Sequence, residues 1–387
     1  MAASQAKAYG ITAQFVRPPA GRATLFWCGK AVFRIPGELP VRQLWIDGDA
    51  LRKLEKDVWS ERYVPAAMIA GNRRYAAKVR YRGGHTREYP KRSYEVIRAG
   101  KTYHYNAEYD DPSMIRNALS FHFFRAIGVP APRARHCLLT LNGKSLGVYL
   151  EIEGVKRPFF RRRGIPVRAL FYAVNNLANF GLRDSDTHKK KASLDAGYTQ
   201  MIGNVRDRKR LTMFIRRLNR RGDPAAEAYL RKKVDVDNYL RWLAGAVLTG
   251  NFDGFEQNYA LYLHAAKRKY RMIPWDYEGT WGRNCYGKAC GSDLVSVRGY
   301  NRLTDKLLSY RRVRRSYKRL LRRLLRKQFT LQELGPVIDR LYLQIRPHIQ
   351  LDSSRKWSVR EFDAEPQFIR RYIEERRELV LRELHRL

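Results

Sequence analysis

The sequence "GNFDGFEQNYALYLH" at residues 250–264 combines an acid, an amide and a continuous apolar run. Asp253 precedes Asn258 by five positions, and residues 259–263 have the pattern of a buried β-strand. A second apolar run, "YRMIPWDYEG" at residues 270–279, carries Asp276 near its end. Two short apolar runs joined by a few residues predict a β-hairpin. Because the open ends of a hairpin lie side by side, the sequence predicts that Asn258 and Asp276 are neighbours.

These three polar residues have the types and the order that phosphoryl transfer requires. The reaction needs oxygen ligands for a divalent metal ion on the phosphates, and a further carboxylate that orients the attacking hydroxyl group. Protein kinases place an Asp and an Asn five residues apart on one loop, with a metal-binding Asp further along the chain. The same spacing fits a polar turn without a catalytic role equally well. Asp253 and Asn258 would then be turn residues, and Asp276 would cap a neighbouring element.

The first half of the chain has the pattern of a β-sheet. Residues 75–83 and 91–97 predict two strands that are antiparallel neighbours. Asn142 and Gly143 predict the two-residue turn of a further hairpin. We therefore expect a sheet-rich N-terminal lobe over residues 1–153.

One helix is expected among these strands. Asp111 suits the N-cap, Pro112 suits the first turn, and Gly128 is expected to end the helix. Apolar side chains recur at every fourth position between them, so the helix is predicted to pack on the sheet. It contains no acidic residue.

Residues 154–387 are predicted to form a mainly helical lobe that carries the hairpin. Residues 237–248 and 303–327 have helical spacing of their apolar positions, and the second range is rich in Lys and Arg. The chain is thus expected to have an α+β fold with two lobes, and a cleft between lobes is a usual ligand site. A final helix over residues 368–387 is expected to bury Phe368, Tyr372, Ile373, Val380, Leu381 and Leu384.

Charge is the unusual feature of the composition. Lys and Arg number 77 against 37 Asp and Glu, which gives a formal net charge of +40. Such a field attracts polyanions, so an acidic or polyanionic partner is expected at the basic surface, unless that surface serves only solvation. The sequence shows no base-reading element, so no specific nucleic acid is expected.

Neither a membrane segment nor a disulfide scaffold is expected. No stretch approaches the roughly 18 consecutive apolar residues of a membrane span, and residues 1–15 lack the basic start and apolar segment of a secretory signal. The chain has four cysteines, too few for a disulfide scaffold, so reduced thiols are expected. They are Cys28, Cys137, Cys285 and Cys290.

Several stretches together resemble the CotH kinase-like family, the spore-coat and related atypical protein kinases. They are "LTGNFDGFEQNYALY" with "YRMIPWDYEGTWG", "VRYRGGHTREYPKRSYEV", "MIRNALSFHFFRAIGVPAPRARHCLLTLNGKSLGVYLEIEGV" and "RGYNRLTDKLL". The resemblance implies a divergent two-lobed protein-kinase-like fold, ATP with Mg²⁺ or Mn²⁺ as cofactors, and phosphorylation of Ser-rich protein substrates such as spore coat proteins. It also implies a spore-forming bacterium, with the protein in the mother-cell cytoplasm and then the spore coat.

The resemblance implies roles for the polar residues of the hairpin. Asp253 would be the catalytic acid that orients the substrate hydroxyl group. Asn258 and Asp276 would hold the metal ion, and Glu278 stands where the family pattern has a second Asp, so that a second metal site would be altered.

Lys91 is the candidate that would contact the nucleotide phosphates. Glu153 is expected to orient this lysine, because the helix after residue 111 offers no acid. The chain has no Gly-x-Gly-x-x-Gly loop, so basic side chains such as Arg80 or Arg82 are expected to cover the phosphates.

Two other functions stay open at this point. One is a non-catalytic scaffold that keeps the fold and binds polyanionic or coat components through its charge. The other is a nucleic-acid-binding protein or metal nuclease that uses Asp253, Asp276 and Glu278.

Overall fold

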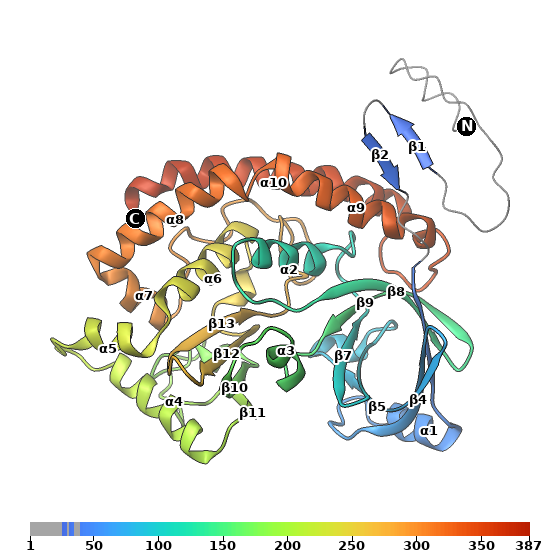
Figure 1. Ribbon diagram of the computed structural model, residues 1–387, viewed down its shortest axis with the longest axis horizontal. Helices are drawn as coiled ribbons and strands as arrows, with labels where there is room; N and C mark the ends of the chain where they lie inside the picture. Colours follow the sequence, from blue (N-terminus) through green and yellow to red (C-terminus); the bar gives the residue numbers. More distant parts are fainter. Residues whose placement is uncertain (1–24, 29–30, 35–38) are drawn as a thin grey trace.

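The N-terminal part of the chain forms a closed β-barrel (Figure 1). The computed structural model describes residues 25–28, 31–34 and 39–387, with side chains described from residue 39 onward; the expectation about residues 1–15 lies outside this part. The barrel closes in the order β3-β4-β5-β6-β7-β9-β8, in which only β3 and β8 are parallel neighbours. Its strands are β3 (Val41–Trp45), β4 (Val64–Ala70), β5 (Arg73–Arg82), β6 (Ser93–Arg98), β7 (Lys101–Asn106), β8 (Ala134–Leu141) and β9 (Lys144–Glu153).

The predicted strands of the first half are present. β5 and β6 pair antiparallel, with Tyr81 opposite Tyr94, and alternate side chains of both strands fill the barrel. Asn142 and Gly143 connect β8 to β9 with positive φ angles of 49° and 83°, as a tight hairpin turn requires. A short hairpin of β1 (Leu25–Cys28) and β2 (Ala31–Arg34) precedes the barrel.

A second, four-stranded sheet carries the hairpin that the sequence predicts. Tyr259 lies opposite Pro274, so the predicted hairpin is confirmed. The expectation of a mainly helical second half missed the other two strands of this sheet, which have seven and five residues and are too short to show a clear period. The sheet order is β11 (Tyr198–Ile202), β10 (Val167–Ala173), β12 (Tyr259–His264) and β13 (Tyr270–Pro274).

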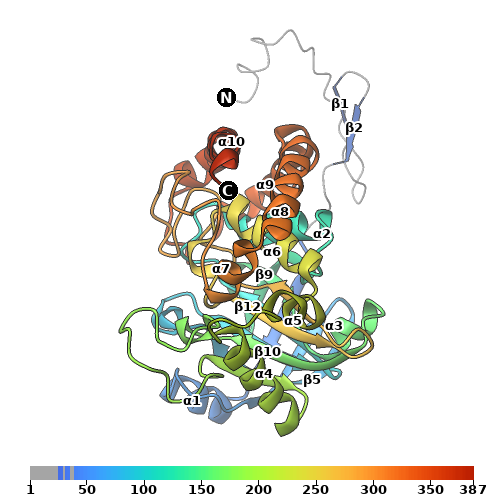
Figure 2. The same cartoon turned by 90° about the vertical axis from the view of Figure 1, so that its left-hand side faces the viewer.

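Long helices cover one side of the two sheets (Figure 2). The barrel is flanked by α1 (Gly48–Lys56), which packs on β4. The largest core lies between the second sheet and the C-terminal helices. The other helices are α2 (Arg116–Ala126), α3 (Arg157–Arg162), α4 (Val205–Leu218), α5 (Ala226–Lys233), α6 (Val236–Thr249), α7 (Arg302–Ser309), α8 (Arg311–Lys327), α9 (Leu331–Ile349) and α10 (Val359–Glu383).

The structure corrects four details of the predicted helices. α2 begins at Arg116, because Asp111 accepts the backbone N–H of Arg116 at 2.9 Å across a preceding turn. It also packs on α6 and α9 as well as on the barrel strand β8. Residues 303–327, which have helical spacing in the sequence, form two helices that meet at Tyr310. In the last helix, Leu381 is 52% exposed instead of buried.

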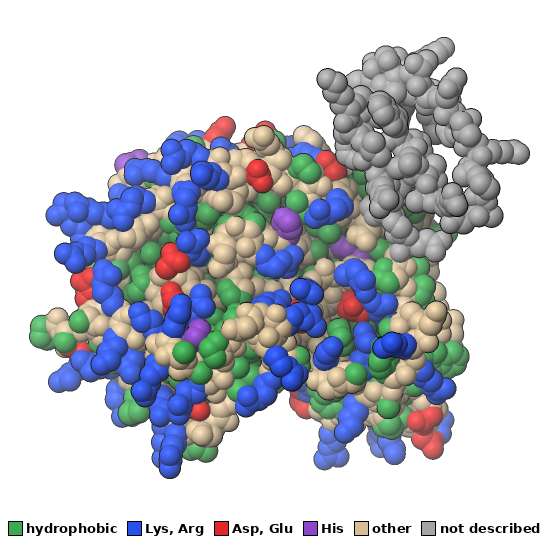
Figure 3. All heavy atoms as spheres, viewed as in Figure 1, with side chains coloured by type: hydrophobic (Ala, Val, Ile, Leu, Met, Phe, Trp, Pro, Cys, Tyr) green, Lys and Arg blue, Asp and Glu red, His purple; other side chains and the backbone are tan. Residues whose placement is uncertain are grey.

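Lys and Arg side chains are spread over the face shown in Figure 3, with few acidic side chains between them. Within the described residues, no helix combines the length and the apolar character that a membrane span needs. The side chain of Cys28 lies outside the described part, and Cys137, Cys285 and Cys290 are free thiols.

Candidate active site

A cavity of about 340 Å³ lies between the barrel and the second sheet. The barrel contributes the ends of β5 and β7, and the second sheet contributes the open end of the β12–β13 hairpin. Five lining residues are acidic, although the whole protein carries a net charge of +40. The polar lining residues include Arg82, His85, Lys91, Asn106, Glu108, Asp110, Asn251, Asp253, Gln257, Asn258, Asp276, Glu278 and Cys285.

Asp253 is held in place by two side-chain amides. Helix α6 ends at Thr249 and is capped by Gly250, and the following 3₁₀ turn, Phe252–Gly254, presents Asp253 to the cavity. Nδ2 of Asn258 donates to Oδ2 of Asp253 at 2.9 Å, and the amide of Gln257 donates to Oδ1. Burial raises the pKa of Asp253, and the nearby charge of Asp276 acts in the same direction. The result is an oriented carboxylate beside an amide oxygen that remains available to a ligand.

The hairpin brings Asn258 and Asp276 together, as the sequence predicts. The backbone N–H of Trp275 donates to the Asn258 carbonyl at 3.1 Å, and Nδ2 of Asn251 donates to the Asp276 carbonyl at 3.3 Å. Asn258 and Asp276 both have left-handed backbones, with φ angles of 57° and 55°. This conformation is strained for residues with a side chain and is concentrated at functional sites.

The donor set at this end of the hairpin fits a divalent cation. Neither Asp276 nor Glu278 forms an ion pair with any residue of the described part. Burial raises the pKa of Asp276, and burial together with the charges of Asp276, Glu108 and Asp110 raises that of Glu278 well above its usual range. The positive charges of Arg82 and His85 lower the pKa of Asp276 without outweighing its burial. A bound metal ion would supply the closer positive charge that carboxylates crowded in a buried site require.

Carboxylate, imidazole and thiol groups alone do not complete such a metal site. Across the described residues, no three of these side chains lie in an arrangement that could hold an ion. Mg²⁺ commonly uses one or two carboxylates, with phosphate oxygens and water as its other ligands. Asp276 with the amide oxygen of Asn258 agrees with this pattern, and the nucleotide would complete it.

Of the residues expected at or beside the nucleotide phosphates, two line the cavity and two do not. Lys91 and Arg82 line the cavity, and Arg82 donates to the Asn106 side chain. Arg80 instead pairs with Glu95 at 2.7 Å. The prediction that Glu153 orients Lys91 is wrong, because the Glu153 carboxylate forms ion pairs with Arg162 and Arg163 instead. The closer contact, to Nη2 of Arg163, is 2.7 Å.

Several residues of the cavity escaped the sequence analysis. Glu108 and Asp110 follow β7, and no motif distinguishes them from surface acids. His85 also lines the cavity, and no metal-binding spacing with another histidine distinguishes it in the sequence. Cys285 also lines the cavity, and burial with the charge of Asp253 raises its pKa to about 11, so the thiol is protonated at neutral pH.

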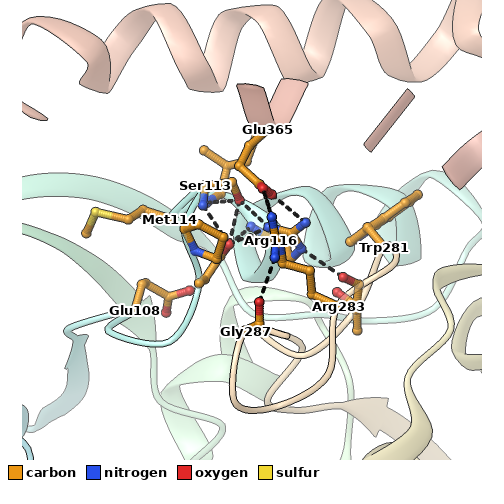
Figure 4. Close-up of polar contacts among 12 residues, drawn as sticks. Glu108, Ser113, Met114, Arg116, Trp281, Arg283, Gly287 and Glu365 are labelled. Atoms are coloured by element: carbon orange, nitrogen blue, oxygen red, sulfur yellow. Dashed lines mark hydrogen bonds and ion pairs between the residues drawn. The ribbon is translucent and has the colours of Figure 1, made fainter. Parts of the chain in front are cut away.

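A buried network fixes the loop that follows Asp276 (Figure 4). Arg116 on α2 is fully buried, pairs with Glu365 of α10 at 2.6 Å, and donates from Nε to the Thr280 carbonyl at 2.8 Å. Glu365 also accepts a hydrogen bond from Nε of Arg283 at 3.0 Å. The C-terminal helix therefore contributes to the support of the candidate metal site.

Comparison with known proteins identifies relatives over most of the chain. Residues 79–380 match the family described as CotH kinase protein. Inner spore coat protein H of Bacillus subtilis (strain 168) is 40% identical over 345 residues, covering 87% of this chain and 95% of that protein. The inner spore coat protein H-like protein of the same organism is 28% identical over 302 residues, covering 77% and 87%.

Among solved structures, a crystal structure of the Helicobacter pylori proinflammatory kinase CtkA aligns with 76% of this chain and 93% of its own. The TM-score is 0.32 and the sequence identity 12%. A likeness at this level carries no argument about fold or mechanism.

Proposed function

This chain belongs to the CotH kinase family, and we propose that it is a protein kinase that transfers the γ-phosphoryl group of ATP to serine or threonine with the help of Mg²⁺ or Mn²⁺. The barrel would be the N-lobe of a divergent two-lobed kinase-like fold, and the second sheet with the long helices would be the C-lobe. The main support is an acidic cavity in a strongly basic protein, in which Asp276 and Glu278 form no ion pair with the described residues.

Each polar residue at the hairpin then has a chemical role. Asp276 and the Asn258 amide oxygen would hold the metal ion, with Glu278 beside them. When bound, the ion would neutralise charge on the phosphates and fix their position. Asp253, oriented by Gln257 and Asn258, would accept a hydrogen bond from the substrate hydroxyl group and direct it at the phosphorus atom.

Two basic side chains would contact the phosphates from the barrel side. Lys91 and Arg82 both line the cavity. Because a Gly-rich loop is missing, these cations would provide the charge stabilisation that backbone N–H groups of such a loop give in other kinases.

Transfer of labelled phosphate tests this function. The full chain is incubated with γ-labelled ATP, Mg²⁺ or Mn²⁺ and a Ser-rich protein, and Asp253→Asn and Asp276→Asn are compared with wild type. We expect metal-dependent labelling of serine and a loss of at least about a hundredfold in both variants. Full activity in both variants would refute the assignment. Folded wild-type protein without a thermal shift in Mg²⁺-ATP would instead support a non-catalytic scaffold.

We also propose a spore coat setting and Ser-rich coat proteins as substrates. The support is the 40% identity to a protein named as an inner spore coat protein, over 95% of its length. Tagged protein produced in a sporulating host should be found first in the mother cell and then in the coat fraction.

A second cavity offers a place for the acidic or polyanionic partner that the net charge suggests. It has a volume of about 710 Å³ and lies between α4, α5 and the far end of the β12–β13 hairpin. None of the acidic residues in the described part lines it, and Met213 in its lining is 55% exposed. This basic groove is defined by Arg168, Arg210, Met213, Phe214, Arg217, Tyr229, Lys232, Lys233, Arg268 and Tyr270.

A further inference from the structure

The loop between α9 and α10 reaches back to the barrel (Figure 1). Residues 352–357 of this loop, called here the C-terminal strap, contact both β9 and the lining of the acidic cavity. These contacts connect the strap to residues that lie more than two hundred positions earlier in the chain.

Asp352 is inserted into the barrel wall. Its Oδ2 accepts the backbone N–H of Val148, on β9, at 2.9 Å, and its side chain is 1% exposed. Gly147 makes room for it, since a Cβ atom there would lie 2.2 Å from the Asp352 carboxylate. Any side chain at position 147 would therefore displace this acid.

The same carboxylate pairs with Lys91. Nζ of Lys91 lies 2.7 Å from Oδ2 of Asp352, and the lysine side chain is only 2% exposed. An ammonium group has three hydrogen-bond donors. Among the described residues Asp352 is the acceptor that Lys91 contacts, and the Tyr149 ring covers another side at 5.0 Å. Lys91 lines the cavity, so donors remain for an anion bound there.

The strap holds a second cavity residue as well. Nζ of Lys356 pairs with Oδ1 of Asp110 at 2.6 Å, and Nε1 of Trp357 donates to the Asp110 carbonyl at 3.2 Å. A Cβ atom on Gly287 would lie 2.0 Å from that carbonyl oxygen. The strap, the segment after β7 and the loop after Asp276 thus meet in close contact beside the cavity.

We propose that Asp352 is the positioning residue of Lys91, so that the C-terminal strap completes the nucleotide side of the active site. Protein kinases pair the ATP lysine with an acid from a helix of the N-lobe. Here α2 contains no acid and Glu153 is engaged with Arg163, whereas Asp352 forms the required pair. The inference rests on the proposed function, because it assumes that Lys91 contacts the phosphates of ATP.

Nucleotide binding and kinetics of paired variants test this role. The Mg²⁺-ATP dissociation constant is measured by calorimetry, with KM for ATP and kcat, for wild type, Asp352→Asn, Lys91→Met and the double variant. Asp352→Asn keeps an acceptor for Val148 but loses the charge, and should raise KM for ATP roughly tenfold while leaving KM for the protein substrate unchanged. Adding Asp352→Asn to Lys91→Met should weaken ATP binding no further, since the acid acts through the lysine.

Two further variants separate positioning from folding. Asp363→Asn removes a partly exposed carboxylate of α10, outside the strap, that pairs with Arg346 at 3.0 Å, so it keeps the Lys91–Asp352 pair and should change KM for ATP less than about twofold. Asp352→Glu keeps the charge and should restore part of the ATP affinity, which also provides a folded variant for comparison.

The inference is overturned if Asp352→Asn lowers the melting temperature but leaves the affinity for ATP unchanged. It is also overturned if the substitution weakens ATP binding equally in the presence and absence of Lys91. Wild-type protein that neither binds Mg²⁺-ATP nor transfers phosphate would overturn the proposed function itself, which is a different result.

Discussion

Asn258 donates a hydrogen bond from Nδ2 to Oδ2 of Asp253 at 2.9 Å, so one amide side chain links the candidate catalytic acid to the candidate metal ligands. The amide has two ends with different chemistry. Its nitrogen orients Asp253, and its oxygen remains available to a cation beside Asp276.

Asn258→Asp and Asn258→Ala should therefore affect different steps. The Asp variant keeps an oxygen ligand but places a carboxylate against Asp253, so kcat should fall roughly a hundredfold while Mg²⁺-ATP still binds. The Ala variant should lose both activity and metal-dependent nucleotide binding. Steady-state kinetics and calorimetry measure the two effects, with Asn72→Asp in an exposed turn as control. Equal activity of Asn258→Asp and wild type would show that Asp253 does not need the amide of Asn258.

Glu278→Gln should change how the stability of the metal-free protein depends on pH. The folded state raises the pKa of Glu278 above its ordinary value of 4.5, so the folded protein binds more protons than the unfolded chain in the range above that pH. Stability contributed by this group is therefore lost as pH rises from about 4.5. The variant should be more stable than wild type by an amount that grows with pH over this range.

Calorimetric melting temperatures from pH 4.5 to 8, with EDTA or with Mg²⁺, check this expectation. Mg²⁺ should stabilise wild type more than Glu278→Gln at the upper end of the range, because the cation offsets the repulsion among the carboxylates. A difference between the two proteins that is independent of pH would show that Glu278 is not crowded by other charges.

The sequence was sufficient to predict the local part of the site. Asp253, Asn258 and Asp276 lie on one hairpin, so strand periodicity and the geometry of the turn predict their proximity. The partner of Lys91 could not be found in this way, because Asp352 is 261 positions away and lies in a loop without a motif. The sequence offers Glu153 in place of an acid on the helix after residue 111, but nearby arginines pair with it instead. Contacts between distant segments depend on how helices pack on the barrel, which hydrophobic periodicity does not specify.

The buried pair of Arg116 and Glu365 should contribute strongly to stability. Both side chains are at most 1% exposed, and Glu365 also pairs with Arg283. Glu365→Gln would leave Arg116 with one charged partner fewer in a dry environment, so the free energy of unfolding should fall by about 3 kcal/mol. Urea denaturation measures this change. Asp339→Asn is the matched control, since its pair with Arg370 is half exposed and should contribute less than about 1 kcal/mol. Similar losses in the two variants would contradict a special role for the buried network.

The basic groove should bind an acidic segment more strongly than the remaining surface does. Lys232→Glu with Lys233→Glu reverses two charges on its lining, and Lys189→Glu with Lys190→Glu makes the same change in net charge at an exposed site outside it. With a fluorescent Glu-rich peptide that carries one leucine, anisotropy should show a roughly tenfold weaker affinity for the groove variant and less than a twofold change for the control. The groove is also lined by apolar side chains, Met213 and Phe214 among them. A peptide without the leucine should therefore bind the wild type more weakly, which is a second test. Equal weakening by both double substitutions would mean that the peptide responds only to the overall field of the protein.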